Sequence, residues 1–420
     1  MSEKPKNCMD DFDPDSLSLD QAVEKILAAV EPVNAQETIS ISSALNRIAF
    51  EPLIAKVDVP SFCSSAMDGY AFRAADWESA ETKFTVVGKS FAGHPYQDSI
   101  GKRECVTIMT GAALPDGTDS VVMQERADRK GDEVSFSQDV KVGQFSRAIG
   151  SDTRSDTTLI NAGTRLTAAH LALLASQGYT DITVYRKLRV AIVSTGDELV
   201  QAGLALSRGQ IYDSNRELLA ALLREMHVDV IDAGVAGDSR DSLEKTLDSV
   251  IGHADVIISS GGVSVGEADF VRPLLEAHGD IHFWKIAMKP GRPLTVARYK
   301  GIPFYGLPGN PVSVAVTFQQ LVTPAIAKMS GTSPAVRITI RVRSVDTLRK
   351  TRGRIEFQRG ILRKNKNGEL VVETTGLQDS HVLSSLVKAN CYVILPLESN
   401  GAEPGDLVDV QPICASLLTI

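Results

Sequence analysis

The sequence predicts a multidomain α/β plus β protein, whose clearest domain is a doubly wound, mostly parallel α/β sheet. Three observations lead to this fold class. The 420 residues exceed the size at which one hydrophobic core keeps growing. Strand, turn and helix patterns repeat from Leu188 onward, which is typical of a parallel sheet covered by helices. Short β-rich runs between Gly, Pro and Asp turn signals lie on both sides of that region.

The segment before the sheet is expected to hold two helices and a β-rich insertion. Ser18 and Gln21 form the pattern of a capping box, and apolar residues follow at helical spacing until Pro32. Runs at 84–88, 104–109, 120–124 and 133–136 predict strands. A further helix is expected over residues 167–177, with Gly178 just beyond its C-terminus.

The α/β region begins with a strand at 188–194 and a helix from about Asn215. Strands at 228–234, 255–260, 281–288 and 304–307 are expected to follow, with helices around Leu243, around Leu274 and from 311 to 329. From Val336 an alternation of apolar and basic residues predicts a half-buried strand over 336–343. Later β-rich runs indicate an antiparallel barrel or sandwich, which we interpret as structural apart from the tract 376–381.

Four domains follow from these patterns. A discontinuous, mixed N-terminal domain covers 1–60 and 145–185, and an inserted β-rich domain covers 61–144. The doubly wound α/β domain covers 186–332, and a C-terminal β-barrel-like domain covers 333–420.

The composition is that of an ordinary globular protein, with 43% hydrophobic and 23% charged residues. No apolar run approaches the roughly 18 residues of a membrane span, and the polar N-terminal segment does not resemble a signal peptide, so we expect a cytoplasmic protein without membrane contact. A net charge of −8 argues against a general nucleic-acid surface, so any anionic substrate must be held locally. The five scattered cysteines contain no CxxC pair and are expected to be reduced.

Ligands of α/β sheets settle at the carboxyl ends of the strands, so the loops there are the first candidates for a site. Three such loops are rich in Gly and polar residues: one after the strand at 188–194, one after 255–260, and one at 306–311. The candidates in them are Ser194, Thr195, Gly196, Glu198, Gly261, Gly262, Ser264, Asp269, Pro308 and Pro311. Glycines allow backbone N–H groups to approach an oxyanion, although an ordinary tight turn is the alternative interpretation. Neither a Walker loop nor a dinucleotide fingerprint is present.

Three cations lie close together in the segment K-I-A-M-K-P-G-R-P: Lys285, Lys289 and Arg292. On an acidic chain they form a candidate clamp for a phosphate or a tetrahedral dianion, and a solvated basic face is the alternative. Five carboxylates at loop positions offer hard oxygen ligands suited to Mg²⁺: Asp68, Asp152, Glu198, Asp238 and Asp269. Each can instead be a cap or turn residue, and Asp238 is the weakest candidate because it precedes Ser239 and a helix.

Six motifs in order resemble the MoeA and gephyrin E-domain family of molybdopterin molybdenumtransferases. They are SAMDGY at 65–70, IMTGA at 108–112, STGDEL at 194–199, SSGGVSVGEAD at 259–269, KxxxKPGRP from Lys285 and GLPGNPVS from Gly306. The tract from Pro60 to Tyr70 has neither helical nor strand periodicity, which already suggests that a site shapes it. Seven histidines without HExxH or GxSxG context disfavour protease or esterase chemistry.

This resemblance implies an elongated homodimer whose α/β domain, of the molybdopterin-binding type, faces the first two domains of its partner. It also implies an enzyme that inserts molybdenum from molybdate into adenylylated molybdopterin, with Mg²⁺-dependent release of AMP, and contacts with other proteins of molybdenum-cofactor synthesis. By position, Asp68, Thr110 and Asp152 would face the partner's cleft. Glu198, Asp238 and Asp269 would serve metal or mechanism, with Glu198 and Asp269 as metal ligands. Lys285, Lys289 and Arg292 would hold the anion, while Pro308 and Pro311 would shape the loop beside them.

The segment 146–152 departs from the family pattern, because two arginines and a glutamate are replaced while Arg147 and Asp152 remain. Cys63 stands where the family often has Asp. Two alternatives therefore stay open: a molybdopterin adenylyltransferase, which shares the doubly wound domain, and a non-catalytic binding or scaffold paralogue. The β-rich insertion and the C-terminal barrel argue against the adenylyltransferase.

Overall fold

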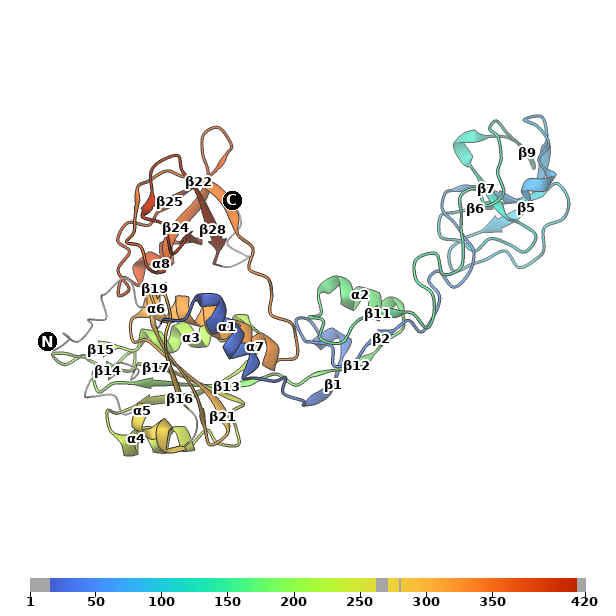
Figure 1. Cartoon of the computed structure of the whole chain (residues 1–420). Coiled ribbons are helices and arrows are strands. Elements are labelled where there is room, and N and C mark those ends of the chain that lie inside the picture. The colour runs from blue at the N-terminus through green and yellow to red at the C-terminus, as the bar shows by residue number, and fades with distance from the viewer. Residues whose placement is uncertain (1–15, 262–270, 279–280, 414–420) are drawn as a thin grey trace. The chain divides into compact units, whose positions relative to one another are not determined.

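A computed structural model describes residues 16–261, 271–278 and 281–413, which fold as two compact units (Figure 1). Unit 1 comprises Met1–Glu37, Asn46–Ile48 and Tyr185–Ile420 as far as they are described, and unit 2 comprises Thr38–Leu45 and Ala49–Val184. The domain boundaries drawn from the sequence stay predictions.

The centre of unit 1 is a six-stranded sheet with the order β16-β13-β17-β21-β20-β18. Strands β13 (Arg189–Thr195), β16 (Asp229–Ala236), β17 (Val256–Ser260) and β21 (Ile302–Leu307) are parallel to one another. Strand β20 (Pro293–Tyr299) runs antiparallel to both β21 and β18 (Ile281–Lys285). The predicted mostly parallel sheet is confirmed, but the sequence reading missed β20, which begins inside the KPGRP motif.

Helices cover both faces of this sheet because its central strands are apolar on both sides. Val190 and Ile192 pack into one core, and the alternating residues Ala191 and Val193 pack into the other. Figure 1 shows the helices on the two faces. The first core receives α3 (Ser214–Glu225), α6 (Pro311–Thr317) and α7 (Thr323–Met329), the last two joined by the π-helical segment Phe318–Val322. The second receives α4 (Arg240–Asp248) and α5 (Val271–His278).

The N-terminal helix α1 (Leu19–Ala28) belongs to unit 1. The predicted capping box is present, since the Ser18 side chain accepts from the Gln21 amide and the Gln21 side chain accepts from the Ser18 amide. Ala22 and Ile26 are fully buried in the same core as Val190. Its apolar face packs on α7 and on the π-helical segment Phe318–Val322. The assignment of residues 1–60 to the mixed N-terminal domain stays a prediction.

The C-terminal part of unit 1 is a closed five-stranded barrel. Its strands are β22 (Ile340–Ser344), β24 (Ile355–Lys364), β25 (Leu370–Thr374), β26 (Cys391–Leu395) and β28 (Leu407–Pro412). They pair in the cyclic order β24, β25, β22, β28, β26 and back to β24. The short strands β23 (Leu348–Arg349) and β27 (Gly401–Ala402) pair beside it, and α8 (Ser384–Lys388) precedes β26.

Two features of this barrel differ from the sequence prediction or extend it. The predicted strand over 336–343 begins only at Ile340, and Val336 and Ile338, expected on a buried face, are 89% and 71% exposed. Arg337 between them turns back to the α/β part, where it donates to the carbonyl oxygen of Gln319 at 3.2 Å. The barrel is also joined to the α/β part by β19 (Met288–Lys289), which pairs in parallel with β24 and sets Lys289 opposite Glu356.

Unit 2 contains a six-stranded, β-rich sheet with the order β7-β4-β6-β5-β9-β8. The strands are β4 (Gly69–Phe72), β5 (Lys83–Ser90), β6 (Glu104–Ile108), β7 (Ser120–Met123), β8 (Ala127–Lys130) and β9 (Glu133–Phe136). The predicted runs at β5, β6, β7 and β9 are confirmed. The rings of Phe72, Phe84 and Phe136 pack at centroid distances of 4.7 to 5.1 Å and form the centre of its core.

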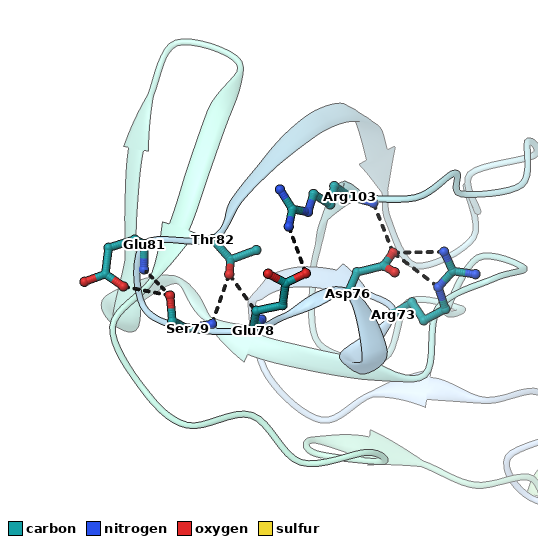
Figure 2. A network of polar contacts seen from close by, with 7 residues as sticks. All are labelled: Arg73, Asp76, Glu78, Ser79, Glu81, Thr82 and Arg103. Atoms are coloured by element: carbon teal, nitrogen blue, oxygen red, sulfur yellow. Dashed lines mark hydrogen bonds and ion pairs between the residues drawn. The ribbon is translucent and has the colours of Figure 1, made fainter.

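A polar network links the segment 73–82, between β4 and β5, to Arg103 just before β6 (Figure 2). Asp76, which is 7% exposed, accepts hydrogen bonds from the Arg73 guanidinium and from the backbone N–H of Arg103. Burial alone would raise the pKa of Asp76, but these donors outweigh it, so its pKa lies below the ordinary value. Glu78 pairs with the Arg103 side chain at 2.9 Å on the surface.

The remaining elements of unit 2 are short. Helix α2 (Ala168–Ser176) is followed by Gly178 with a φ of +73°, as predicted for a residue just beyond the helix. The short strands are β1 (Gln36–Ser40), β2 (Leu53–Ile54), β3 (Ser64–Ser65), β10 (Ser146–Arg147), β11 (Thr158–Ile160) and β12 (Asp181–Tyr185). The 3₁₀ turns are Ile41–Ser43, Ala74–Asp76 and Gln124–Arg126. No helix in the described part of the chain is long and apolar enough to span a membrane.

Candidate active site

The carboxyl ends of three neighbouring strands in unit 1 bring the predicted loops together. Ser194 of β13 lies opposite Ser260 of β17, and Ser260 lies opposite Leu307 of β21. The buried hydroxyls of Ser194 and Ser260 are 3.4 Å apart. Parallel strands end at one edge, so the loops that follow them meet there. The structure therefore brings Ser194, Thr195 and Gly261 to the same edge as the loop at 306–311. Their role as site residues stays a prediction.

Gly261 is required here by close packing. Its φ is +87°, and a Cβ atom at this position would lie 2.8 Å from the carbonyl oxygen of Thr195 and 2.9 Å from its Oγ1. The backbone N–H of Gly261 donates to Leu307 O at 3.1 Å, and that of Gly196 donates to Ala236 O at 3.3 Å. These two amides are already bonded within the protein, so the glycines act through close approach rather than as oxyanion donors. Gly262 and Ser264 lie outside the described residues.

Two predicted acids lie at this edge. The Glu198 carboxylate folds back over Gly196, where an added Cβ would lie 2.4 Å from Glu198 Oε2. Asp238 accepts from the Asp197 amide at 3.3 Å, and the Asp238 amide donates to Asp197 Oδ1 at 2.9 Å. The Asp238 side chain therefore joins two loops, and the cap of α4 is Ser239. Asp238 is held as a turn residue, which is the alternative that the sequence left open for it.

The resemblance implies magnesium ligands at Glu198 and Asp269. Within 16–261, 271–278 and 281–413, no three His, Cys, Asp or Glu side chains are grouped to hold a metal ion. Asp269, the predicted partner of Glu198, lies outside these ranges. The pair of Glu198 and Asp269 as metal ligands therefore stays a prediction.

The loop at 306–311 is fixed from two sides. Asn215, at the start of α3, donates through Nδ2 to the carbonyl oxygen of Gly309 at 2.6 Å. Asn310 donates to Ser380 Oγ at 3.0 Å, and the Val312 amide donates to Ser380 O at 3.1 Å. Pro308 is buried in this loop, and Pro311 begins α6, where a missing N–H costs nothing. The sequence reading missed Asn215, whose role depends on a contact 94 residues away.

A pocket of about 640 Å³ lies where the KPGRP segment meets the barrel. Its charged lining residues are Lys289, Arg292, Arg349, Arg354, Arg359, Glu356 and Asp379. Five cations against two carboxylates leave an excess of three positive charges, on a chain whose net charge is −8. Two of the three predicted clamp cations line this pocket, whereas Lys285 is not among its lining residues. The pocket is suited to an oxyanion carrying more than one negative charge.

The barrel supplies most of this lining, although the sequence indicated a functional role only for its tract 376–381. Arg359 is 1% exposed, and its Nε donates to Ser385 Oγ at 3.0 Å. Burial lowers the pKa of the Arg359 guanidinium, which stays charged because an arginine begins from a very high value. The tract 376–381, singled out in the sequence, contributes Gly376, Gln378, Asp379 and Ser380. The buried polar residues of β24 carried no local signal, since their contacts come from the distant KPGRP segment and from the tract 376–381.

Unit 2 holds the other predicted residues, of which Asp68 and Thr110 are in contact. Asp68 Oδ1 accepts from the Thr110 amide at 2.6 Å and from Thr110 Oγ1 at 2.8 Å. These two bonds, the backbone one first, lower the pKa of Asp68. Strand β10 pairs with β3, which places Arg147 opposite Ser64. Asp152 is exposed and follows this pairing, with its amide bonded to Val59 O at 3.0 Å.

Three family models match successive segments that together cover most of the chain. Residues 17–178 match the MoeA N-terminal region (domains I and II), residues 191–328 match a probable molybdopterin binding domain, and residues 341–413 match the MoeA C-terminal region (domain IV). These matches cover both units and include the loops, the KPGRP segment and the barrel described above.

Relatives match over nearly the full length. A molybdopterin molybdenumtransferase of Haemophilus influenzae is 43% identical over 94% of this chain and 98% of its own. Gephyrin of Dictyostelium discoideum is 33% identical over 93% of this chain and 61% of its own. The crystal structure of a MoeA protein of molybdopterin biosynthesis from Pyrococcus horikosii matches with a TM-score of 0.79 and 30% identity, over 95% of this chain and 100% of its own. The chain belongs to the MoeA family of molybdopterin molybdenumtransferases, enzymes of molybdenum cofactor biosynthesis.

Proposed function

We propose that this enzyme transfers molybdenum from molybdate to adenylylated molybdopterin and releases AMP. The observation that carries the proposal is the pocket lined by Lys289, Arg292 and Arg359, with its excess of three positive charges. Molybdate is a tetrahedral dianion, and planar guanidinium groups bind such oxygens in pairs. Full-length similarity to transferases favours this function over the adenylyltransferase and over a non-catalytic scaffold.

The chain's own residues have three tasks in this proposal. The cations of the pocket neutralise the dianion and hold it beside the loop at 306–311. The edge formed by Thr195, Gly261 and Gly309 is tightly packed and can hold the pterin-bearing substrate at a fixed position. Fixed placement matters because an enzyme gains rate from pre-organised geometry rather than from contact alone.

Magnesium is a further part of the proposal. Glu198 offers hard carboxylate oxygens of the kind that Mg²⁺ prefers, and Asp269 would complete the pair. Bound Mg²⁺ would supply charge neutralisation at the phosphoanhydride. We also propose a cytoplasmic homodimer in which unit 2 of one copy, with Asp68, Thr110 and Asp152, faces unit 1 of the other. Light scattering of the purified protein tests the dimer.

The direct test is AMP release from adenylylated molybdopterin, measured with and without molybdate and Mg²⁺. Release stimulated by both, and lost in Lys289→Ala and Asp68→Ala, supports the transferase. Absence of release from a folded, dimeric wild type overturns it. ATP consumption in place of AMP release would instead identify the adenylyltransferase.

A further inference from the structure

The cationic pocket contains a buried acid that none of the predicted roles uses. Glu356 is 5% exposed and lies in β24, directly opposite Lys289 in the parallel pairing of β19 with β24. Its Oε1 is 3.3 Å from Lys289 Nζ. Residues opposite each other in a ladder point to the same face, so the backbone itself sets this pair.

The surroundings show that this acid is built into the pocket. Gln358 is 3% exposed, and its Nε2 donates both to Glu356 Oε1 at 3.1 Å and to the carbonyl oxygen of Arg349 at 2.9 Å. The amide therefore fixes the carboxylate between the segment carrying Arg349 and the ammonium of Lys289. A buried carboxylate is costly unless it is paired and hydrogen-bonded, and here it is both.

The pair also limits how strongly the pocket attracts an anion. The Lys289 side chain is 49% exposed, so its ammonium is accessible on one side while Glu356 holds it on the other. The carboxylate cancels one of the five positive charges of the lining at close range. A site that hands an oxyanion on to a second substrate must release it, and an excessively cationic pocket would retain it.

We propose that Glu356 is an internal counter-ion that positions the Lys289 ammonium and keeps the pocket's affinity for a tetrahedral dianion low enough for transfer. This inference rests on the proposed function, because it assigns the pocket to the oxyanion substrate. Glu356 is a positioning and affinity-setting residue rather than a catalytic one.

The test measures sulfate and molybdate binding by calorimetry, without the pterin substrate. Glu356→Gln keeps an oxygen acceptor for Gln358 and Lys289 but removes one negative charge, so both dianions should bind about tenfold tighter. In turnover, the KM for molybdate and kcat should fall together. Glu356→Asp, which keeps the charge, should retain the weak affinity of the wild type.

Asp379→Asn is the matched control. It removes the other negative charge of the lining, but Asp379 is exposed, so solvent should screen the effect to less than about twofold. Unchanged or weaker dianion binding in a folded Glu356→Gln protein would overturn the counter-ion role while the transferase stands. If the wild type binds neither dianion, the counter-ion role and the pocket assignment both fail, whereas AMP release remains a separate measurement.

Discussion

The Nδ2 atom of Asn215 lies 2.6 Å from the carbonyl oxygen of Gly309, so the start of α3 holds the loop that follows β21. This hydrogen bond joins the side chain of a residue in α3 to the backbone of a loop 94 residues further along the chain. Because the loop continues into Asn310 and α6, its position also depends on Ser380 of the barrel. The geometry of the candidate site therefore depends on Asn215, which does not line the pocket, as well as on Ser380, which does.

Asn215→Ala should lower kcat/KM for AMP release about five- to tenfold, since one hydrogen bond of about 1 kcal/mol that positions the loop is lost. Thermal unfolding should change little, because the loop lies at the surface edge of the sheet. Ser214→Ala is the control, as the Ser214 side chain is exposed on the neighbouring position. Wild-type kinetics in Asn215→Ala would show that the loop needs no such support.

Thr110→Val should raise the pKa of Asp68 toward its ordinary value. The substitution removes the hydroxyl donor at 2.8 Å and keeps the amide donor at 2.6 Å, so part of the lowering remains. Carbon-13 NMR titration of the Asp68 carboxylate measures this shift. If Asp68 acts as a carboxylate in turnover, the acid limb of the kcat/KM profile should move to higher pH as well. Thr110→Ser keeps the hydroxyl and should restore the wild-type titration.

A structural feature can be predicted from the sequence when the residues that form it are close together along the chain. The alternation of Val190, Ala191, Ile192 and Val193 predicts a strand buried on both faces, and the structure assigns these residues to two cores. The capping box at Ser18 is likewise local and was predicted correctly. In contrast, the domain to which the helix after Ser18 belongs depends on packing against segments roughly 300 residues away, which periodicity does not reveal.

The candidate site likewise combines residues that a local motif reveals with residues that only long-range contacts reveal. Gly261 and Lys289 belong to unusual local motifs and were predicted from them. Glu356, Gln358 and Arg359 are charged or polar residues in a strand, which reads locally as a solvent-facing pattern. They are buried by contacts from distant segments: Lys289 of β19 pairs with Glu356, while Ser385 Oγ and the carbonyl oxygen of Asp379 accept from Arg359. These long-range contacts, which no local pattern reveals, make the strand one wall of the pocket.

Gly261→Ala should destabilise unit 1 and reduce activity. Alanine would have to adopt a φ of +87°, and its Cβ would lie 2.8 Å from the Thr195 carbonyl oxygen. Backbone strain and a steric clash would therefore both destabilise the variant. We expect a loss of about 2 to 3 kcal/mol in the free energy of unfolding. Gly203→Ala is the matched control, because its φ is +97° but nothing lies within 4 Å of the new atom. It should cost only about 1 kcal/mol, and equal losses in both variants would argue against the clash.

Asp76→Asn should destabilise unit 2 in a pH-dependent way. The pKa of Asp76 is lowered in the folded state, so the carboxylate contributes stability above its ordinary value of about 3.9 and loses it as the pH falls through the folded-state value. At pH 7 the variant should lose about 2 kcal/mol, since the Arg73 and Arg103 donors lose a buried charged acceptor. Urea unfolding followed by the fluorescence of Trp77 measures the difference, which should shrink toward zero in acid.

Glu78→Gln, which breaks an exposed pair of the same network (Figure 2), should cost less than about 0.5 kcal/mol at either pH. A constant loss for Asp76→Asn from pH 7 into acid would mean that packing, rather than the charge, explains the effect.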